Sequence, residues 1–543
     1  MKNIILTKYI IFLSLVLSSC SDFLSEKSVT NYSVQYIYGS PEGLKLATTA
    51  LYALDRDYYN DTEASTRVSL DRATDLATSI GGTGNFYGNY NPVYLKPSAG
   101  QPKWMWQKMY AMIGKCNDII TAGEQLPQNS LTVQAVSEAR AFRAQSYFLL
   151  FRTFDRIWIN TESTTPENIN TPRDYKAASR KEVFDLLYSD LDYAIKNMIE
   201  KPTDVGRFTK AAARHLKAKV ALWKEDWDEV IEQTDSIELA GYSLMPLEDV
   251  FNAANLNHNE ALFVQQFSKN PGGYLVTPTS SNNVIGHDMA SQFIAIYRNE
   301  IPGDGSDATC SFLNWGYTYG RCLPSPYLLG LYDQGKDKRY QTYYIHKYVN
   351  FTKDTIVYGD PTKNVKVAPD SVFPIQKWNK DTKLLTWNQQ VFPGCVKFGD
   401  VYTRATQGET KSFKDIIVYR LAETYIMAAE AALRKGNQML AKKYYNKTWQ
   451  RAGNDEFSGT LRMVDIMNEQ ARELAFEGDR WYFLKRLGKL IEQVQKYNGD
   501  ERLPTTIVGR VNLPANPHFL RWPIPESEVI NMGADKFSQN PGY

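Results

Sequence analysis

The stretch SEARAFRAQSYFLLFRTF, residues 137–154, has the residue spacing of a buried helix. With 3.6 residues per turn, its apolar side chains fall on one stripe. These residues are Ala139, Phe142, Ala144, Tyr147, Phe148 and Phe151. A second run, residues 209–223, carries small and branched apolar residues in a similar arrangement. Together the two runs predict a mainly α-helical fold.

Helical patterning divides the chain into three parts. It extends over residues 41–254, which we interpret as an N-terminal helical scaffold, and it returns over 413–543. Residues 255–412 are instead rich in Gly, Pro, Asn, Asp and aromatic residues, a composition typical of loops and short strands. We expect this middle part to be a loop-rich, mixed region that binds the ligand. The last residues, from RWPIPESEVI onward, have a loop-like composition.

A weak internal repeat lies within the two helical parts. AKVALWKEDWDEVIE, residues 218–232, aligns with AEAALRKGNQMLAKK, residues 429–443. Ala218 matches Ala429 and Leu222 matches Leu433, and a short polar turn follows in both copies. Small residues let two antiparallel helices approach closely, as in tetratricopeptide units. The repeat therefore predicts helix pairs that serve as scaffold.

The N-terminus has the pattern of an export signal. A short basic region precedes an apolar run at residues 9–17, which is too short to span a bilayer. Leu17-Ser18-Ser19-Cys20 resembles a bacterial lipobox, in which the cysteine is acylated, for example with palmitate. We therefore expect residues 1–19 to be a signal peptide that is removed, Cys20 to carry the lipid, and 20–40 to be a tether. A plain signal peptide with a chance cysteine is the alternative.

Charge and cysteine content exclude several classes of protein. Removing residues 1–19 takes away Lys2 and Lys8 and leaves a nearly neutral chain, which argues against a nucleic-acid partner. Four further cysteines in a chain of this size are not a disulfide framework. Cys310 and Cys322 are close enough in sequence to close a loop, and free buried thiols are an equal alternative.

Motifs of enzymatic chemistry are missing from the sequence. It contains no Cys-x-x-Cys, His-Glu-x-x-His or Gly-x-Ser-x-Gly, and its five histidines lack metal-ligand spacing. We therefore expect no metal, no cofactor and no catalytic residue. The best acid pair is Glu473 and Glu477, four residues apart on one helical face. Because Arg472 and Arg480 flank this pair, structural ion pairing is favoured over glycoside hydrolysis.

Two regions combine aromatic residues with polar side chains that donate and accept hydrogen bonds. Sugar sites use this mixture, because sugars present flat C–H faces and rings of hydroxyls. The candidates in the first region are Arg72, Asp75, Asn85, Tyr87 and Tyr90, and those in the second are Asn314, Trp315, Tyr317 and Tyr319. If the second stretch is extended, its three aromatic residues share one side. Filling a small core beneath the loops is the alternative for any one of them.

Several segments together resemble the SusD/RagB family of outer-membrane nutrient-uptake lipoproteins. They are Cys20-Ser21-Asp22-Phe23-Leu24, WQKMYAMIGKCNDII (106–120), residues 137–154, GRFTKAAARHLKAKVALWKEDW (206–227), YRLAETYIMAAEAALRKG (419–436), ARELAFEGDRWYFLKRLG (471–488) and LRWPIPESEVINMGADKFSQNPGY (520–543). One departure follows Phe154, where the family usually has a Gly-containing turn. This chain has Asp155-Arg156-Ile157-Trp158 there, which leaves the shape of that loop open.

The resemblance implies a SusD-like fold, with a scaffold of tetratricopeptide-like helix pairs and a loop-rich binding region. It also implies a partner, a SusC-like TonB-dependent outer-membrane barrel, and a ligand that is an oligosaccharide or, in some members, a peptide. We therefore expect a non-enzymatic binding protein, lipid-anchored in the outer membrane and facing the exterior. An exported lipoprotein glycoside hydrolase and a structural subunit without ligand contact are the alternatives.

Overall fold

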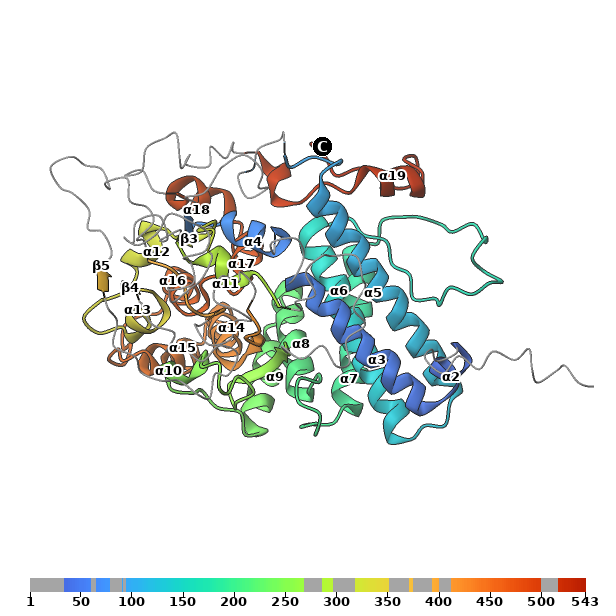
Figure 1. The fold of residues 1–543 in the computed structure, drawn as a ribbon, viewed down its shortest axis with the longest axis horizontal. Coiled ribbons are helices and arrows are strands. Elements are labelled where there is room, and N and C mark those ends of the chain that lie inside the picture. The colour runs from blue at the N-terminus through green and yellow to red at the C-terminus, as the bar shows by residue number, and fades with distance from the viewer. Residues whose placement is uncertain are drawn as a thin grey trace, which may run out of the picture.

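The computed structural model describes residues 34–59, 65–78, 90, 94–267, 286–295, 318–350, 371–374, 393–399, 412–499 and 516–543. Its architecture is mainly α-helical, as the sequence predicted. Figure 1 shows long helices of the N-terminal half on one side and shorter helices of the C-terminal half on the other. None of the helices within the described ranges has the length and apolar character needed to cross a membrane.

The N-terminal half is built around one buried helix, α6 (Ser130–Phe154). Asn129 caps its first turn by accepting a hydrogen bond from the backbone N–H of Thr132 at 3.0 Å. The apolar stripe predicted for residues 137–154 is buried along its whole length. Helix α6 is enclosed on further sides as well, because four helices pack around it. They are α3 (Pro41–Arg56), α5 (Gly100–Gln125), α7 (Arg180–Asn197) and α8 (Lys210–Lys224).

The two copies of the predicted repeat each form a helix pair. Helix α8 pairs with α9 (Trp227–Leu239), and α14 (Leu421–Arg434) pairs with α15 (Gln438–Arg451). Each pair turns through a left-handed residue, Glu225 in the first and Gly436 in the second. Glycine adopts that conformation without steric cost. Helix α9 also contacts α14, so the pairs stack on one another as scaffold.

Strands in the described residues are short and come in antiparallel pairs. They are β1 (Ala77–Thr78) with β3 (Leu323–Pro324), β2 (Ala261–Gln265) with β6 (Ile416–Arg420), and β4 (Lys347–Asn350) with β5 (Ser371–Pro374). Short helices accompany them: α4 (Ser65–Arg72), α10 (Leu247–Val250), α11 (Met289–Phe293), α12 (Pro326–Gly330) and α13 (Lys338–Tyr343). A separate apolar cluster lies under these elements. Short α2 (Val34–Gly39) and η1 (Asp57–Tyr59) flank α3.

The C-terminal segment returns to the N-terminal half. Helices α16 (Met463–Leu474), α17 (Arg480–Arg486) and α18 (Leu490–Tyr497) precede a tail that contains η7 (Pro517–Leu520) and α19 (Glu526–Met532). In Figure 1 this tail runs along the top to the ends of α5 and α6. Asn540 donates to the carbonyl of Phe154 at 2.7 Å, and Trp522 N–H donates to Thr153. The loop-like tail of the sequence thus includes a short helix, which begins directly after Pro525.

Candidate functional site

The structure brings parts of the two polar–aromatic regions together at one corner, although they are about 240 residues apart in the chain. Strand β1 follows Asp75, and β3 follows Arg321. The pairing joins Ala77 to Pro324 and Thr78 to Leu323. Ser325 then donates its hydroxyl to the carbonyl of Asp75 at 2.8 Å. We call this junction of residues 71–78 and 318–325 the β1–β3 corner.

Asp75 lies inside the β1–β3 corner and has no solvent exposure (0 %). Both of its carboxylate oxygens accept hydrogen bonds from Arg480 at the start of α17, from Nε at 2.9 Å and from the terminal nitrogen at 2.6 Å. A bidentate pair of this kind fixes the geometry of both groups. Asp75 therefore joins the corner to α17, and its carboxylate is already occupied by Arg480.

Arg72 and Tyr90 are enclosed as well, each with 3 % of its surface exposed. Burial lowers the pKa of Arg72 to about 10. The Tyr90 hydroxyl donates to the carbonyl of Ala73 at 2.5 Å, and its ring packs edge-on against Phe519. These side chains hold the corner in shape from within. Any contact they make with a ligand stays a prediction.

Tyr319 is the candidate that the structure places at the edge of the corner. Its side chain is half-buried, and the guanidinium of Arg321 lies 4.4 Å from its ring centre. The backbone around it is fastened to α11, because Tyr319 N–H donates to Ser291 at 2.7 Å and Gly320 N–H donates to Ile294 at 2.9 Å. The Tyr319 ring therefore belongs to a segment whose backbone is held in place by these two hydrogen bonds.

The sequence analysis did not identify a stacked pair of tyrosines that lies beside the corner. The rings of Tyr327, in α12, and Tyr497, at the end of α18, are 3.9 Å apart and nearly parallel at 16°. Both side chains are half-buried. Asn498, the next residue along, donates to the carbonyls of Arg72 and Thr74 and so fixes the pair against the corner. No sequence signal links two tyrosines 170 residues apart, so only the fold reveals this platform.

The remaining candidates lie outside the described residues. They are Cys20 at the expected lipidation site and Asn85, Tyr87, Asn314, Trp315 and Tyr317 in the two loop regions. Cys310 also lies outside them, while Cys322 is a fully buried free thiol. Burial raises the pKa of the Cys322 thiol well above its usual value.

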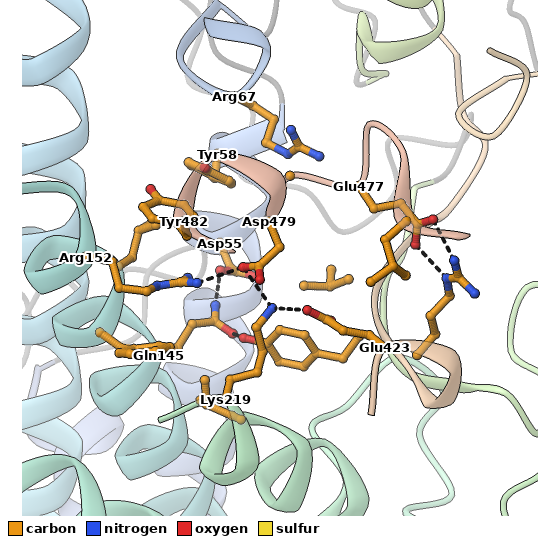
Figure 2. A pocket seen from close by; sticks show the side chains of 18 of the residues that line it. Asp55, Tyr58, Arg67, Gln145, Arg152, Lys219, Glu423, Glu477, Asp479 and Tyr482 are labelled. Atoms are coloured by element: carbon orange, nitrogen blue, oxygen red, sulfur yellow. Dashed lines mark hydrogen bonds and ion pairs between the residues drawn. The ribbon is translucent and has the colours of Figure 1, made fainter. Parts of the chain in front are cut away.

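The acid pair of the hydrolase alternative does not share a helical face, because α16 ends at Leu474. Phe476 then turns the chain with a positive φ of 65°, so only Glu473 is helical. Glu477, labelled in Figure 2, accepts a hydrogen bond from Nε of Arg420 at 2.6 Å. Glu473 binds Arg420 at 2.7 Å and Arg339 at 2.9 Å. The structural pairing that the sequence favoured is confirmed, with partners other than Arg472 and Arg480.

The electrostatics of these acids oppose proton-transfer chemistry. Burial acts to raise the pKa of Glu473, but the arginines around it outweigh burial and hold the pKa well below its usual value. The same balance, with Arg420 and Lys397 as the cations, lowers the pKa of Glu477. A general acid needs a pKa near the working pH. Both carboxylates are therefore ionised structural groups. Within the described ranges no three His, Cys, Asp or Glu side chains form a metal-ligand cluster.

A polar cavity of about 90 Å³ adjoins the β1–β3 corner through Arg67, which lines the cavity and pairs with Asp71. Residues of α6, α8, β6, α14 and the turn before α17 also line it. Figure 2 shows Arg152, Lys219, Glu423 and Asp479 meeting there. Asp55 also lines the cavity. Burial raises its pKa to about 7, although the amides of Gln265 and Gln145 donate to its carboxylate.

Comparison with known proteins identifies the family. The model described as "SusD family" matches residues 278–543, and the model described as "Starch-binding associating with outer membrane" matches residues 22–222. The chain belongs to the SusD family.

Relatives within the SusD family are distant in sequence and similar in fold. A SusD-like protein of Formosa agariphila is 24% identical over 572 residues, covering the whole of both chains. A SusD-like protein of Bacteroides ovatus is 28% identical over 274 residues, 47% of this chain and 48% of the relative. This alignment therefore spans about half the length of that relative. Among solved structures, a "Laminarin binding SusD-like protein" matches with a TM-score of 0.66 and 20% identity, over 92% of this chain and 99% of that one.

Proposed function

We propose that this SusD-family protein captures an oligosaccharide at the β1–β3 corner without hydrolysing it. The observation that carries the proposal is the pairing of β1 with β3, which joins the two regions in which aromatic and polar residues alternate. The half-buried Tyr319 and the Tyr327–Tyr497 stack offer flat aromatic faces there. Such faces pack against the C–H surfaces of sugar rings. The laminarin-binding relative and the starch-binding family description support a carbohydrate ligand.

In this proposal the loop residues supply the direct contacts. They are Asn85, Tyr87, Asn314, Trp315 and Tyr317, together with Tyr319. Arg72, Asp75 and Tyr90 act from within, by fixing the backbone that carries the loops. A peptide ligand is the alternative within the same function, and the experiment below separates the two.

The test uses soluble protein that starts after Cys20, run on native gels that contain laminarin, xyloglucan or starch. We expect one glycan to retard the wild-type protein and expect Trp315→Ala and Tyr319→Ala to remove that retardation. The matched control is Tyr36→Ala, which truncates an exposed tyrosine (42 % exposed) on α2, remote in sequence from both regions. Retardation that survives both substitutions would contradict the assigned site. If no glycan retards the protein, a peptide ligand or the structural-subunit alternative replaces the proposal.

The same gels test the hydrolase alternative. A hydrolase would shorten the glycan during the run, and Glu473→Gln would stop the shortening in a protein that still folds. We expect no shortening, because Glu473 is fully buried and its carboxylate is held by three arginines, Arg339, Arg420 and Arg451.

We further propose that Cys20 carries a lipid that anchors the protein in the outer membrane, facing the exterior. Several acyl chains hold a protein at a membrane almost permanently, at ~0.8 kcal/mol per buried CH₂. Cells fed labelled palmitate should label the wild-type protein and leave Cys20→Ser unlabelled and unattached. Protease treatment of intact cells then reports the orientation, since an exterior protein is digested. Label on the Cys20→Ser protein would contradict the anchor.

The proposed destination of the ligand is a SusC-like TonB-dependent barrel, for which the protein acts as a lid. Full-length protein purified from mild-detergent extracts of its own membrane should bring such a barrel with it in a fixed ratio. The control is the Cys20→Ser protein mixed with the same extract. A protein that purifies alone in both cases would contradict delivery to a barrel and leave glycan capture untouched.

A further inference from the structure

The cavity is lined by residues other than those of the β1–β3 corner and has the features of a small binding site. Side chains from α6, α8, β6 and α14 and from the turn 477–479 surround it (Figure 2). We propose that this cavity binds one small, neutral polyol of the size of glycerol. This site goes beyond the proposed capture of an oligosaccharide, and it involves none of the loop candidates.

The charges that line the cavity are already balanced. Arg152 pairs with Asp479 at 2.8 Å, and Lys219 bridges Asp479 at 3.1 Å and Glu423 at 2.6 Å. On the far wall Arg420 pairs with Glu477 at 2.6 Å. Placing an ion here would add an uncompensated charge to a low-dielectric site, which is costly. A neutral ligand leaves every pair in place, so the charge pattern favours hydroxyl groups.

Hydrogen-bonding capacity remains at the centre of the cavity. Asp479 uses only Oδ1 in its two ion pairs, and across the described ranges no side chain or backbone group donates to its Oδ2. The Asp479 side chain is 23 % exposed and lines the cavity. Nε of Arg152 is buried without a partner in the described structure. A carboxylate oxygen that accepts, next to a guanidinium nitrogen that donates, can bind two neighbouring hydroxyl groups of one ligand.

Aromatic packing fixes the direction of that donor. The guanidinium of Arg152 lies between two rings, 4.2 Å from the centre of Phe148 and 4.1 Å from the centre of Tyr482. The Tyr482 hydroxyl is itself held by Thr153 at 2.7 Å. A guanidinium sandwiched in this way keeps its nitrogens in one plane. The donor edge therefore needs little ordering when a ligand binds, which favours affinity.

Apolar side chains complete the lining. Met109, Phe148, Leu149, Leu216, Val418 and Leu474 face the same cavity. Leu149 and Val418 are the half-buried members of this apolar set. Apolar side chains beside fixed polar groups are typical of small-molecule sites. It suits a ligand that has C–H bonds on one side and hydroxyls on the other.

The size of the cavity limits its occupant. A volume of about 90 Å³ holds roughly three waters at ~30 Å³ each, or one three-carbon polyol, and it is too small for a sugar ring. The size limit distinguishes this site from the corner, which we expect to bind longer chains. It also sets the probe, which is glycerol.

The experiment measures saturation transfer by NMR from the soluble protein to glycerol, with D-glycerate as a charged comparison of similar size. We expect transfer to glycerol and none to D-glycerate. Leu149→Phe, which puts a larger apolar side chain into the lining, should weaken glycerol binding at least tenfold. Val418→Phe gives a second, independent obstruction in case one variant unfolds. Tyr319→Ala, at the corner, should bind the small probe as well as the wild type does.

Three NMR results would overturn the proposal. They are the absence of transfer to glycerol, transfer that Leu149→Phe and Val418→Phe leave unchanged, and transfer that Tyr319→Ala removes. A crystal soaked in glycerol gives the decisive location, and ordered waters alone in the cavity would also overturn the proposal. Failure at the cavity leaves glycan retardation by the corner intact, so the two proposals are tested separately.

Discussion

At the scale of single residues, Asp155 occupies a backbone conformation that normally favours glycine. It follows α6 directly and has a φ of 61°. With ψ at −47°, this positive φ is sparsely populated and costs a residue with a Cβ roughly 1–3 kcal/mol. The Asp155 carboxylate offsets this cost by accepting from buried Lys485 at 2.6 Å and pairing with Arg521 at 3.3 Å. Asp155 thus stands where the family usually has a glycine-containing turn after Phe154. Its backbone is strained, and its ion pair with Arg521 fixes the C-terminal tail.

A comparison of two substitutions separates strain from pairing at Asp155. Asp155→Gly and Asp155→Ala both lose the two ion pairs, and only glycine relieves the backbone strain. We expect Asp155→Gly to be about 1 kcal/mol more stable than Asp155→Ala in urea unfolding. Equal stabilities would show that the conformation carries no strain.

Asp55 gives the cavity a pH-sensitive residue. Because burial raises its pKa to about 7, from an ordinary value of 3.8, the folded protein holds the proton more tightly than the unfolded chain does. The contribution of Asp55 to stability is therefore full below about pH 4 and is lost as pH rises towards 7. We expect Asp55→Asn to unfold at higher urea than the wild type at pH 8. The advantage over the wild type should grow by on the order of 2 kcal/mol between pH 5 and pH 8. An advantage that does not change with pH would contradict the raised pKa.

At the scale of elements, one buried ion pair sets the position of the β1–β3 corner. Asp75 precedes β1, and Arg480 begins α17, 405 residues later in the chain. Arg480 also donates to the carbonyl of Met467 and to Gln470, both in α16. One guanidinium therefore connects the corner, α16 and α17. Both charges of the ion pair are buried away from solvent.

Substitution of Asp75 distinguishes this structural role from direct ligand contact. Asp75→Ala leaves Arg480 buried without its partner, which costs roughly 3–5 kcal/mol. We expect a large loss of stability in urea unfolding, with glycan binding falling only as the corner loosens. The control, Asp228→Ala, breaks an exposed pair with Lys435 and should change stability by less than about 1 kcal/mol. A stable Asp75→Ala protein that no longer binds glycan would instead place Asp75 at the ligand.

At the scale of the whole molecule, a network of buried ion pairs joins elements of the C-terminal half. Arg339 from α13 reaches Glu469 and Glu473 on α16, and Arg420 from β6 reaches Glu260. These groups are buried, so each charge depends on its partner. The network holds α16 against strands and helices from distant parts of the chain.

This network makes the fold sensitive to acid. Arginine and lysine partners outweigh burial and lower the pKa of Glu423, Glu469, Glu473 and Glu477 below the ordinary value of 4.5. Their contribution to stability is present above about pH 4.5 and is lost as pH falls towards the lowered values. We expect the free energy of unfolding to fall steeply between pH 5 and pH 3 in urea titrations. A flat profile over that range would contradict the lowered pKa values.

The sequence by itself determined the helical scaffold, the repeat and the family. These features are local: the stripe in α6 and the glycine turn at Gly436 follow from the preferences of neighbouring residues. The sequence also predicted ion pairing at Glu473 and Glu477, because Arg472 and Arg480 flank them. It could not name the actual partners, which come from β6 and α13.

The tertiary structure alone decided which candidates face inward. Asp75 and Arg72 have the residue types of a sugar site, yet contacts with α17 and the segment after α18 bury them. The Tyr327–Tyr497 stack and the cavity around Asp479 likewise join residues far apart in the chain. Burial depends on which segments pack together, and no local pattern encodes that pairing. The sequence therefore gives the kind of site, and the fold decides which residues form it.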